Sequence, residues 1–253
     1  MDPRIEPDLN PHSLMSRKAL LSAFCLAFLG ILGCGRTRPW EDMNELQLTR
    51  LVVSEPKNDT ARYYLGLILY RDGRPTEAEP HFREAVKLNP RNPDAHRYLG
   101  RLLMDKGQLL EAEAELREAI LLDPERADAR VDLGTVLMLT GRDSAAVAEW
   151  NEALRLNPNS AEAHYNLGVW LYKQGRKEEA KKKFQEALRI NPDYTKAHAN
   201  LGVIYKEDGD YENARKELEK AAELFEKQGK IGDVGKVMEI LRTLPGYSER
   251  DTR

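Results

Sequence analysis

Apolar, small and turn-forming residues recur along most of this chain at a fixed interval of 34 residues. Leu-Gly pairs stand at Leu65-Gly66, Leu99-Gly100, Leu133-Gly134, Leu167-Gly168 and Leu201-Gly202. Prolines recur at Pro56, Pro90, Pro124, Pro158 and Pro192, and glycines at Gly73, Gly107, Gly141, Gly175 and Gly209. Alanines recur at Ala78, Ala112, Ala146, Ala180 and Ala214, and again at Ala85, Ala119, Ala153, Ala187 and Ala221. Columns that keep one register through five copies cannot arise from composition alone, so they indicate an internal repeat.

Each unit of this repeat predicts two helices joined by a short turn. Gly66 and its equivalents fall within the first helix, where glycine costs about 1 kcal/mol relative to alanine. Such a cost is tolerated where two helices approach too closely for a Cβ, while Leu65, Phe82 and their equivalents fill the space between the helices. Gly73 and its equivalents can supply a left-handed turn. The Asn-Pro or Asp-Pro pair at 89–90, 123–124, 157–158 and 191–192 ends the second helix of the first four units, because the residue before proline is pushed out of the α region.

This unit resembles the tetratricopeptide repeat, a helix–turn–helix motif of 34 residues, over roughly residues 59–228. The family's tryptophan near the start of the unit is replaced here by Arg62, His96, Arg130, His164 and His198. The recurrence of histidine in this column invites a metal site, but we expect these side chains to pack rather than to bind metal. Glu226 stands where the family has proline, so we expect the second helix of the fifth unit to run on.

The predicted fold is therefore all-α, an α-solenoid of about five tetratricopeptide units between two covering segments. The units are expected at 59–92, 93–126, 127–160, 161–194 and 195–228. A half-repeat helix is expected at 40–58, because Leu48, Leu51 and Pro56 keep second-helix register. A capping helix is expected at 229–244, followed by a tail at 245–253. Terminal segments of such arrays must present a polar outer face.

The start of the chain differs from the body. Arg17 and Lys18 precede an apolar run over residues 19–33, which as a helix reaches only about 22 Å, short of the roughly 30 Å hydrocarbon core. A positive start and a short apolar run are typical of a secretory signal peptide, which we place at 1–33. Met15 opens a conventional signal of its own, so residues 1–14 are either part of the protein or an upstream extension.

Ile31-Leu32-Gly33-Cys34 resembles the bacterial lipobox. The resemblance implies that the signal is cut after Gly33 and that the Cys34 thiol carries diacylglycerol, with residues 34–39 as a short tether. The alternative is an uncleaved anchor, or a buried helix with an incidental cysteine. Beyond Cys34 there is no cysteine, so the body cannot form an internal disulfide and depends on packing.

Composition narrows the possible functions. The chain carries 39 basic and 42 acidic residues, a formal net charge of -3, which does not favour binding to a phosphate backbone. No His-Glu-x-x-His or Gly-x-Ser-x-Gly motif occurs, and the glycine-rich stretch at 229–236 lacks the spacing and the hydroxyl residue of a phosphate loop. We therefore expect no catalytic residue, no metal, no cofactor and no small-molecule substrate.

The resemblance implies a groove lined by the first helix of each unit. Its expected ligand contacts are Tyr63, Tyr64, Arg97, Tyr98, Arg101, Asp132, Tyr165, Asn166, Tyr172, Lys173, Lys196 and Asn200. In peptide-binding members the column of Asn166 and Asn200 hydrogen-bonds the ligand backbone, and we expect Tyr165 and Asn166 on the solvent side of their helix. The family's carboxylate clamp is matched only at Asn166 and Lys196, which argues against a receptor for chaperone tails.

Together these patterns predict a lipid-anchored scaffold of the bacterial envelope that binds protein segments in its groove. The chain resembles the small lipoproteins that assist assembly of envelope complexes, and the resemblance implies a role with a pilus, a secretion system or the cell-wall machinery. Gly35 rather than aspartate follows Cys34, so in a bacterium with two membranes the expected place is the outer membrane, facing the periplasm. The alternatives are an accessory subunit acting through its convex face or its ends, or an envelope enzyme of unrecognised activity.

Overall fold

The computed structural model describes Trp40 and residues 42–247. The chain divides into residues 1–42 and 43–253, and only the second part is considered below. The predicted signal peptide, Cys34 and the tether at 34–39 lie outside the described residues, as does the tail from residue 248. Within the described part, no helix is both long enough and apolar enough to cross a membrane.

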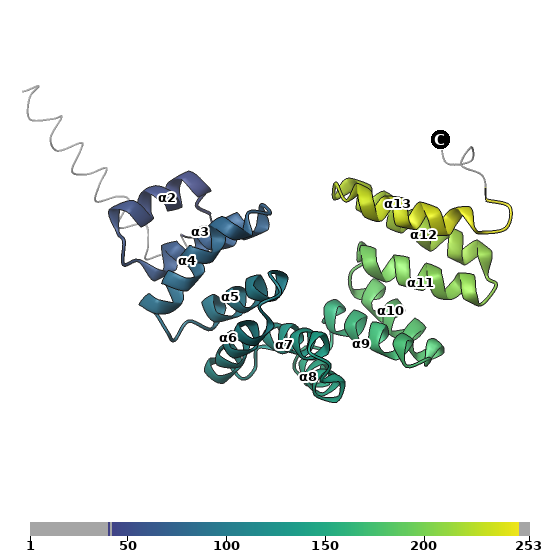
Figure 1. The fold of residues 1–253 in the computed structure, drawn as a ribbon, viewed down its shortest axis with the longest axis horizontal. Coiled ribbons are helices and arrows are strands. Elements are labelled where there is room, and N and C mark those ends of the chain that lie inside the picture. Colours follow the sequence, from purple (N-terminus) through teal and green to yellow (C-terminus); the bar gives the residue numbers. More distant parts are fainter. Residues whose placement is uncertain (1–39, 41, 248–253) are drawn as a thin grey trace, which may run out of the picture. The chain divides into compact units, whose positions relative to one another are not determined.

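A single helix, five helix pairs and a last helix follow one another along residues 43–247 (Figure 1). The single helix is α2 (Glu45–Ser54). The pairs are α3 (Asp59–Arg71) and α4 (Pro75–Leu88), α5 (Pro93–Asp105) and α6 (Leu109–Leu122), α7 (Ala127–Leu139) and α8 (Asp143–Leu156), α9 (Ala161–Lys173) and α10 (Lys177–Ile190), and α11 (Thr195–Glu207) and α12 (Tyr211–Lys227). The last helix is α13 (Ile231–Arg242).

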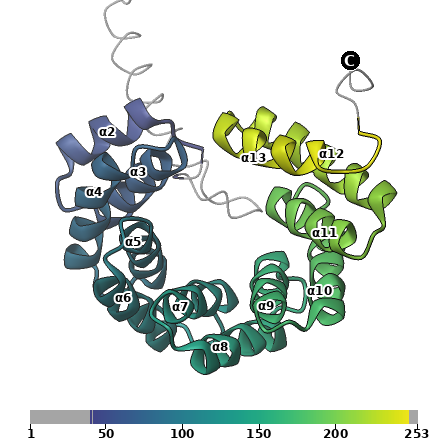
Figure 2. The same ribbon diagram turned by 45° about the vertical axis from the view of Figure 1, so that its right-hand side comes forward.

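Each helix packs most extensively against its partner in the same pair, and then against the next pair. Figure 2 shows the pairs along an arc, with α3, α5, α7, α9 and α11 on its inner side and α4, α6, α8 and α10 on its outer side. This arrangement confirms the predicted all-α solenoid. The inner side of the arc is called the concave face below.

The recurrence of glycine in the Leu-Gly pairs is explained by a large side chain of the second helix that lies over each glycine. A Cβ added to Gly66 would lie 3.0 Å from Cδ1 of Phe82, and one added to Gly134 would lie 2.6 Å from Cδ1 of Trp150. The same relation joins Gly100 to Leu116, Gly168 to Phe184 and Gly202 to Leu218. The nearest approach would be no more than 2.7 Å in units 2 to 5, which is closer than real Cβ atoms come, and 3.0 Å in unit 1, which is unusually tight. Glycine is therefore favoured by the packing inside every unit.

The turns inside the pairs use the second glycine column. Gly73 has φ of 74° and Gly209 has φ of 79°, and the three equivalents between them have similar values. Residues other than glycine adopt this left-handed backbone conformation only at an energetic cost. The left-handed turn predicted from the sequence is therefore present in all five units.

The two ends of the array are covered differently. At the start, α2 buries Leu48 and Val52, and its Glu45 pairs with Arg74 at 2.9 Å. At the other end, α12 has 17 residues where α10 has 14, as expected from the missing proline. Helix α12 shares one apolar cluster with α13 and the residues that follow it, and the buried members are Ala214, Leu218, Ala221, Phe225, Val237, Leu241 and Leu244.

Candidate functional site: the concave face

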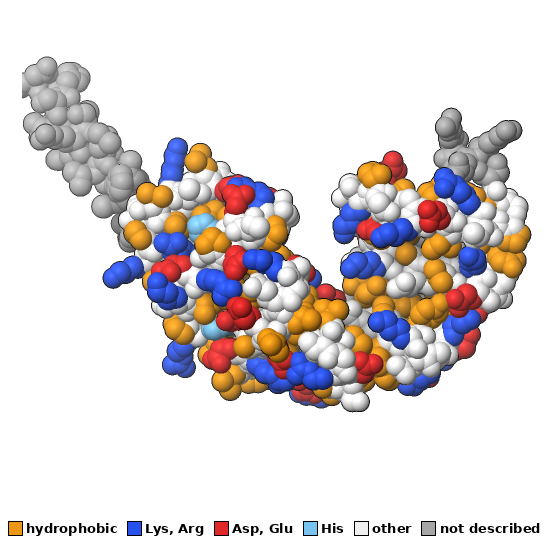
Figure 3. Space-filling view, in the orientation of Figure 1, with side chains coloured by type: hydrophobic (Ala, Val, Ile, Leu, Met, Phe, Trp, Pro, Cys, Tyr) orange, Lys and Arg blue, Asp and Glu red, His pale blue; other side chains and the backbone are white. Residues whose placement is uncertain are grey.

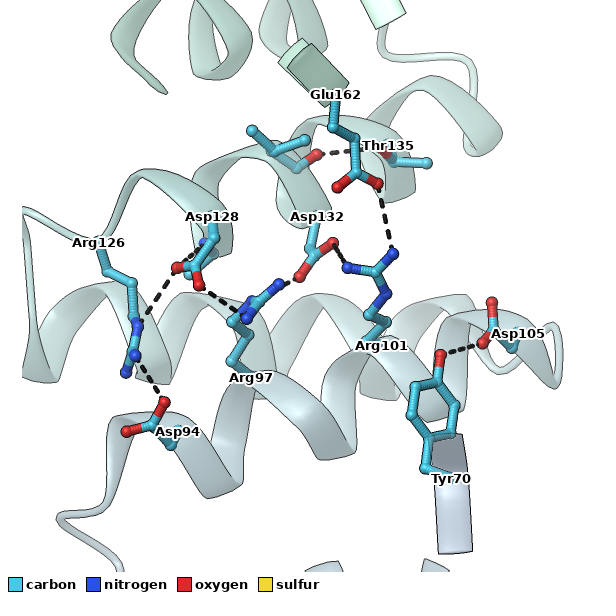
Figure 4. A network of polar contacts seen from close by, with 12 residues as sticks. Tyr70, Asp94, Arg97, Arg101, Asp105, Arg126, Asp128, Asp132, Thr135 and Glu162 are labelled. Atoms are coloured by element: carbon cyan, nitrogen blue, oxygen red, sulfur yellow. Dashed lines mark hydrogen bonds and ion pairs between the residues drawn. The ribbon is translucent and has the colours of Figure 1, made fainter. Parts of the chain in front are cut away.

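Charged side chains on the concave face of units 2 to 4 form a connected network (Figure 4). The Arg97 guanidinium of α5 pairs with Asp128 at 2.7 Å and with Asp132 of α7 at 2.8 Å. Arg101, one helical turn later, lies 3.4 Å from Asp132 and 3.4 Å from Glu162 of α9. The network thus joins three consecutive first helices.

Asp132 is the most deeply buried charged side chain of this network, with 1% of its surface exposed, and Arg97 is 8% exposed. Burial raises the pKa of Asp132 to about 6, against the opposing effect of the Arg97 and Arg101 guanidiniums. We expected Arg97 and Asp132 to contact a ligand. In the structure both side chains instead lie buried in the contact between units 2 and 3. Removing either partner of such a pair would leave an uncompensated buried charge.

Tyr63 is also enclosed, with 8% of its surface exposed. Its ring lies 4.9 Å from that of Tyr64 and 5.9 Å from that of Tyr98, measured between centroids. Tyr98 in turn stacks on Phe82 at 6.0 Å and lies under the Arg97 guanidinium at 5.0 Å, a cation–π arrangement. The predicted ligand contact at Tyr63 is therefore replaced by a packing role between units 1 and 2.

The concave face of units 3 to 5 is different, because it holds two cavities that share the residue Tyr165. A cavity of about 190 Å³ between α7 and α9 is lined by Thr135, Met138, Leu139, Trp150, Tyr165, Asn166, Val169, Trp170 and Lys173. A cavity of about 280 Å³ among α9, α11, α12 and α13 is lined by Tyr165, Lys196, Ala199, Asn200, Val203, Phe225, Asp233, Lys236, Val237 and Ile240. Five of the predicted groove residues thus meet at one place: Tyr165, Asn166, Lys173, Lys196 and Asn200.

Tyr165 is held in place by packing as well as by hydrogen bonding. Its ring lies 5.8 Å from that of Phe184 and 5.0 Å from that of Tyr194. Its hydroxyl accepts a hydrogen bond from Nδ2 of Asn200 at 3.3 Å. Burial raises the pKa of Tyr165, although the Asn200 hydrogen bond opposes the shift. Tyr165 is therefore half-buried: its ring packs against the core of unit 4 and also lines both cavities.

The two asparagines each use one amide N–H within the protein. Asn166 donates from Nδ2 to Oγ1 of Thr135 at 3.1 Å, which links α9 to α7, and Asn200 donates to Tyr165 as described. Among the described residues, neither Oδ1 accepts a hydrogen bond. Both amide carbonyls, one repeat apart, therefore remain available as acceptors beside the cavities.

The walls of the two cavities are positively charged overall. Lys173 and Lys196 are exposed, and neither forms an ion pair within the part of the chain that the structure describes. Lys236 pairs with Asp233 at 2.9 Å. The lining therefore carries three cations and one anion in a chain whose net charge is -3. Figure 3 shows basic and apolar side chains along the inner margin of α11 and α13.

Tyr172 is the predicted groove residue of α9 that lies outside both cavities. Its hydroxyl donates to Oε1 of Glu207 at 2.5 Å, and this hydrogen bond, together with burial, raises the pKa of Tyr172 to about 12. Glu207 also pairs with Lys177 at 2.9 Å. Tyr172 therefore helps to join units 4 and 5.

Comparison with protein-family models decides what this array is. Models described as tetratricopeptide repeat match residues 46–93, 65–120, 161–194 and 183–216, and one described as TPR repeat matches residues 134–175. The chain belongs to the tetratricopeptide repeat family. No curated protein sequence matches it significantly.

Solved structures of tetratricopeptide proteins resemble this one. MamA is 27% identical, with a TM-score of 0.50, over 66% of this chain and 97% of that chain. YrrB, described as a TPR protein with an unusual peptide-binding site, is 23% identical with a TM-score of 0.50, over 72% of this chain and 93% of its own. PilF of Pseudomonas aeruginosa is 21% identical with a TM-score of 0.58, over 75% and 93% respectively. The fold is thus that of a protein–protein interaction scaffold.

The histidines that replace the tetratricopeptide tryptophan have a role common to their column. Each of the five side chains at this position hydrogen-bonds the carbonyl of the proline six residues earlier; for His198 and Pro192 the distance is 2.8 Å. Nδ1 of His198 also contacts Glu217 at 2.6 Å. Among the described residues, no cluster of three His, Cys, Asp or Glu side chains could hold a metal ion. The column therefore connects each first helix to the end of the preceding second helix.

Several residues of the candidate site were not predicted. Met138, Leu139 and Trp150 line the smaller cavity, and Lys236 and Ile240 of α13 line the larger one. Leu139 could have been found, because it follows Thr135 by one helical turn and so extends a groove-facing column of the tetratricopeptide pattern. The α13 residues lie outside the 34-residue register, so that pattern carries no signal for them.

Proposed function

We propose that this protein is a membrane-tethered scaffold that binds a segment of a partner protein on the concave face of units 3 to 5. The observation that carries the proposal is the pair of adjoining cavities around Tyr165, with two amide acceptors beside them. The corresponding face of units 1 to 3 is occupied by the protein's own ion pairs. A bound segment could therefore place side chains in the cavities of units 3 to 5 and donate hydrogen bonds from its main chain to the asparagine carbonyls.

The tether and the location of the protein are part of this proposal. The lipobox-like Ile31-Leu32-Gly33-Cys34 supports lipidation at Cys34, and two or more acyl chains would give stable anchoring where one gives only marginal binding. The scaffold would then hold its partner at the envelope during assembly of a surface or cell-wall complex. The likeness to YrrB supports peptide binding by analogy of fold alone. We propose no enzymatic activity.

Site-specific crosslinking tests the binding surface. A photoreactive amino acid at Leu139, which is 58% exposed and lines the smaller cavity, should form crosslinks to a partner in the native envelope. The same group at Leu121, 72% exposed on α6, is the matched control. Asn166→Ala/Asn200→Ala, which keeps the Tyr165 ring, should abolish the Leu139 crosslinks while circular dichroism stays unchanged. Equal crosslinking at the two positions, or crosslinks that survive in the folded double variant, would exclude this face as the binding surface.

The tether is tested separately. Cells are labelled with a fatty-acid analogue, and wild type is compared with Cys34→Ser. Loss of label together with release from the membrane fraction supports the anchor. Equal labelling, or equal membrane retention without label, contradicts it.

A further inference from the structure

We propose that the concave face of units 3 to 5 selects an acidic protein segment that carries two apolar side chains. This inference rests on the proposed function, since it names the kind of segment that the same surface would bind. Three features of the described residues carry it: the number of cavities, the charge of their walls and the state of the two asparagines.

The two cavities call for two apolar anchors. Val169 and Met138 belong to the apolar lining of the smaller cavity, and Val203, Val237 and Ile240 to that of the larger one. At about 190 and 280 Å³, both are smaller than the usual range of roughly 300 to 1,000 Å³ for small-molecule sites. Cavities of this size suit single side chains rather than a whole ligand. Because Tyr165 lines both, the two anchors would lie on either side of its ring.

The charge of the walls sets the composition of the segment between and around the anchors. Lys173 lies at the smaller cavity and Lys196 at the larger one, and both are exposed without an ion pair in the described part of the chain. On the face of units 1 to 3, by contrast, Arg97 and Arg101 are matched by carboxylates of the protein itself. Complementary charge across an interface favours the correct partner, and like charges brought together disfavour the wrong one. Carboxylates on the segment would therefore be favoured and basic side chains rejected.

The asparagines add binding without adding sequence preference. The unused Oδ1 atoms of Asn166 and Asn200 can accept hydrogen bonds from main-chain N–H groups, which every residue except proline provides. Main-chain pairing supplies affinity, while pockets and charges supply specificity, as in other peptide-binding grooves. The selection therefore comes from the anchors and the lysines.

A peptide selection identifies the preferred segment directly. The full chain, purified in detergent, is immobilised and used to select phage-displayed random peptides of about 12 residues. We expect the recovered peptides to be enriched in aspartate and glutamate and to contain two apolar positions. Replacing either apolar residue of a recovered peptide by serine should weaken its binding, measured by fluorescence anisotropy, by about tenfold, on the scale of a hot-spot residue.

Charge-reversal variants test the lysines. Lys173→Glu/Lys196→Glu should weaken binding of a recovered peptide by at least about tenfold, because like charges would then face each other. The matched control, Lys182→Glu/Lys216→Glu, makes the same change in net charge at exposed positions of α10 and α12 and should leave the affinity within about twofold. Binding by wild type should weaken with added salt, as expected for exposed charges.

The outcomes separate this inference from the proposed function. If recovered peptides lose binding with Asn166→Ala/Asn200→Ala but are neutral or basic, the concave face binds segments and the acidic preference is wrong. The inference also fails if the inner-wall and control reversals weaken binding equally. If acidic peptides bind the asparagine variant as tightly as wild type, the proposed surface itself is wrong.

Discussion

At the scale of single residues, each unit is held together by a glycine matched to one large side chain. The partner varies from phenylalanine in units 1 and 4 to leucine in units 2 and 5 and tryptophan in unit 3, yet the glycine is constant. The tightest case is Gly134, where the Trp150 indole also donates a hydrogen bond to the carbonyl of Val131 at 3.2 Å. The indole is therefore fixed on two sides and has little freedom to move away.

Gly134→Leu should consequently destabilise the protein by about 3 kcal/mol, at the upper end of overpacking costs. Thermal or urea unfolding monitored by circular dichroism measures the effect. Lys182→Ala, at an exposed position of α10, should change the free energy of unfolding by less than about 0.5 kcal/mol. Equal stability of the two variants would show that Gly134 does not lie at the close contact.

The histidine column contains two electrostatic situations. Burial opposes protonation of His96 and His198, but hydrogen bonds to Glu115 and Glu217 and to the proline carbonyls outweigh it, so both pKa values are raised above 6.5. For His164 the residue at the glutamate position is Lys183, and burial together with this lysine lowers the pKa. The same column thus favours the charged form in units 2 and 5 and the neutral form in unit 4.

The pH dependence follows from these directions. His96 and His198 stabilise the fold below pH 6.5, and this contribution is lost as the pH rises through their raised folded values. The contribution of His164 is present above pH 6.5 and is lost as the pH falls through its lowered folded value. NMR titration of the imidazole protons should give a lower pKa for His164 than for His96 and His198. Lys183→Glu should move His164 upward to join them, and an unchanged value would contradict the assigned cause.

At the scale of helices, the 34-residue columns were enough to predict each pair, its turn and the extension of α12, because the contacts that define a pair lie within one unit. The candidate site was predicted less fully. Asn166, Lys173 and Asn200 occupy columns that the family resemblance marks, and they do line the cavities. Burial of Arg97 and Asp132 could not be foreseen, since it depends on how far one unit rotates against the next, which no single repeat encodes.

Helix α13 belongs both to the apolar core at the end of the array and to the candidate site. It buries Val237 and Leu241 against α12 and also contributes Lys236 and Ile240 to the larger cavity. Leu241→Ala should cost about 2–4 kcal/mol locally, as for other buried leucines. Hydrogen exchange should show faster exchange in α13 and the end of α12, with α3 to α8 unchanged. Faster exchange throughout the array would contradict a local role.

At the scale of the whole array, the contacts between units are uneven. Units 2 and 3 are joined by Arg142 and Glu113 at 2.9 Å as well as by the buried network. Units 4 and 5 are joined by Lys177 and Lys181 to the end of α11. Between units 3 and 4 themselves, the described side chains form no ion pair, and their side-chain hydrogen bond is that of Asn166 with Thr135. The one ion pair of the described residues that passes over this junction is the 3.4 Å contact of Arg101 in unit 2 with Glu162 in unit 4. The smaller cavity lies at the same junction.

The stability of a repeat array is a sum of terms from units and from their interfaces, so unfolding should divide at this junction. In native-state hydrogen exchange with increasing urea, the amides of α3 to α8 and those of α9 to α13 should form two groups with different free energies of opening. Thr135→Val, which removes the hydrogen bond from Asn166, should widen the difference. A single common free energy for all helices would show that the junction is as strong as the others.

The contrast between constant cores and changing interfaces also bears on how such a gene can change in length. Recombination between repeats copies or deletes a whole unit, and every unit brings its own glycine together with that glycine's large partner, so the core of a transplanted unit stays complete. The contacts between units are not preserved in this way. Glu113 pairs with Arg142 of the next unit, but the equivalent residue is Val147 one unit later and Lys181 two units later. A shuffled array would fold unit by unit but bring mismatched side chains together at its new junctions. The order of the five units is thus specified by the side chains at their interfaces and not by those in their cores.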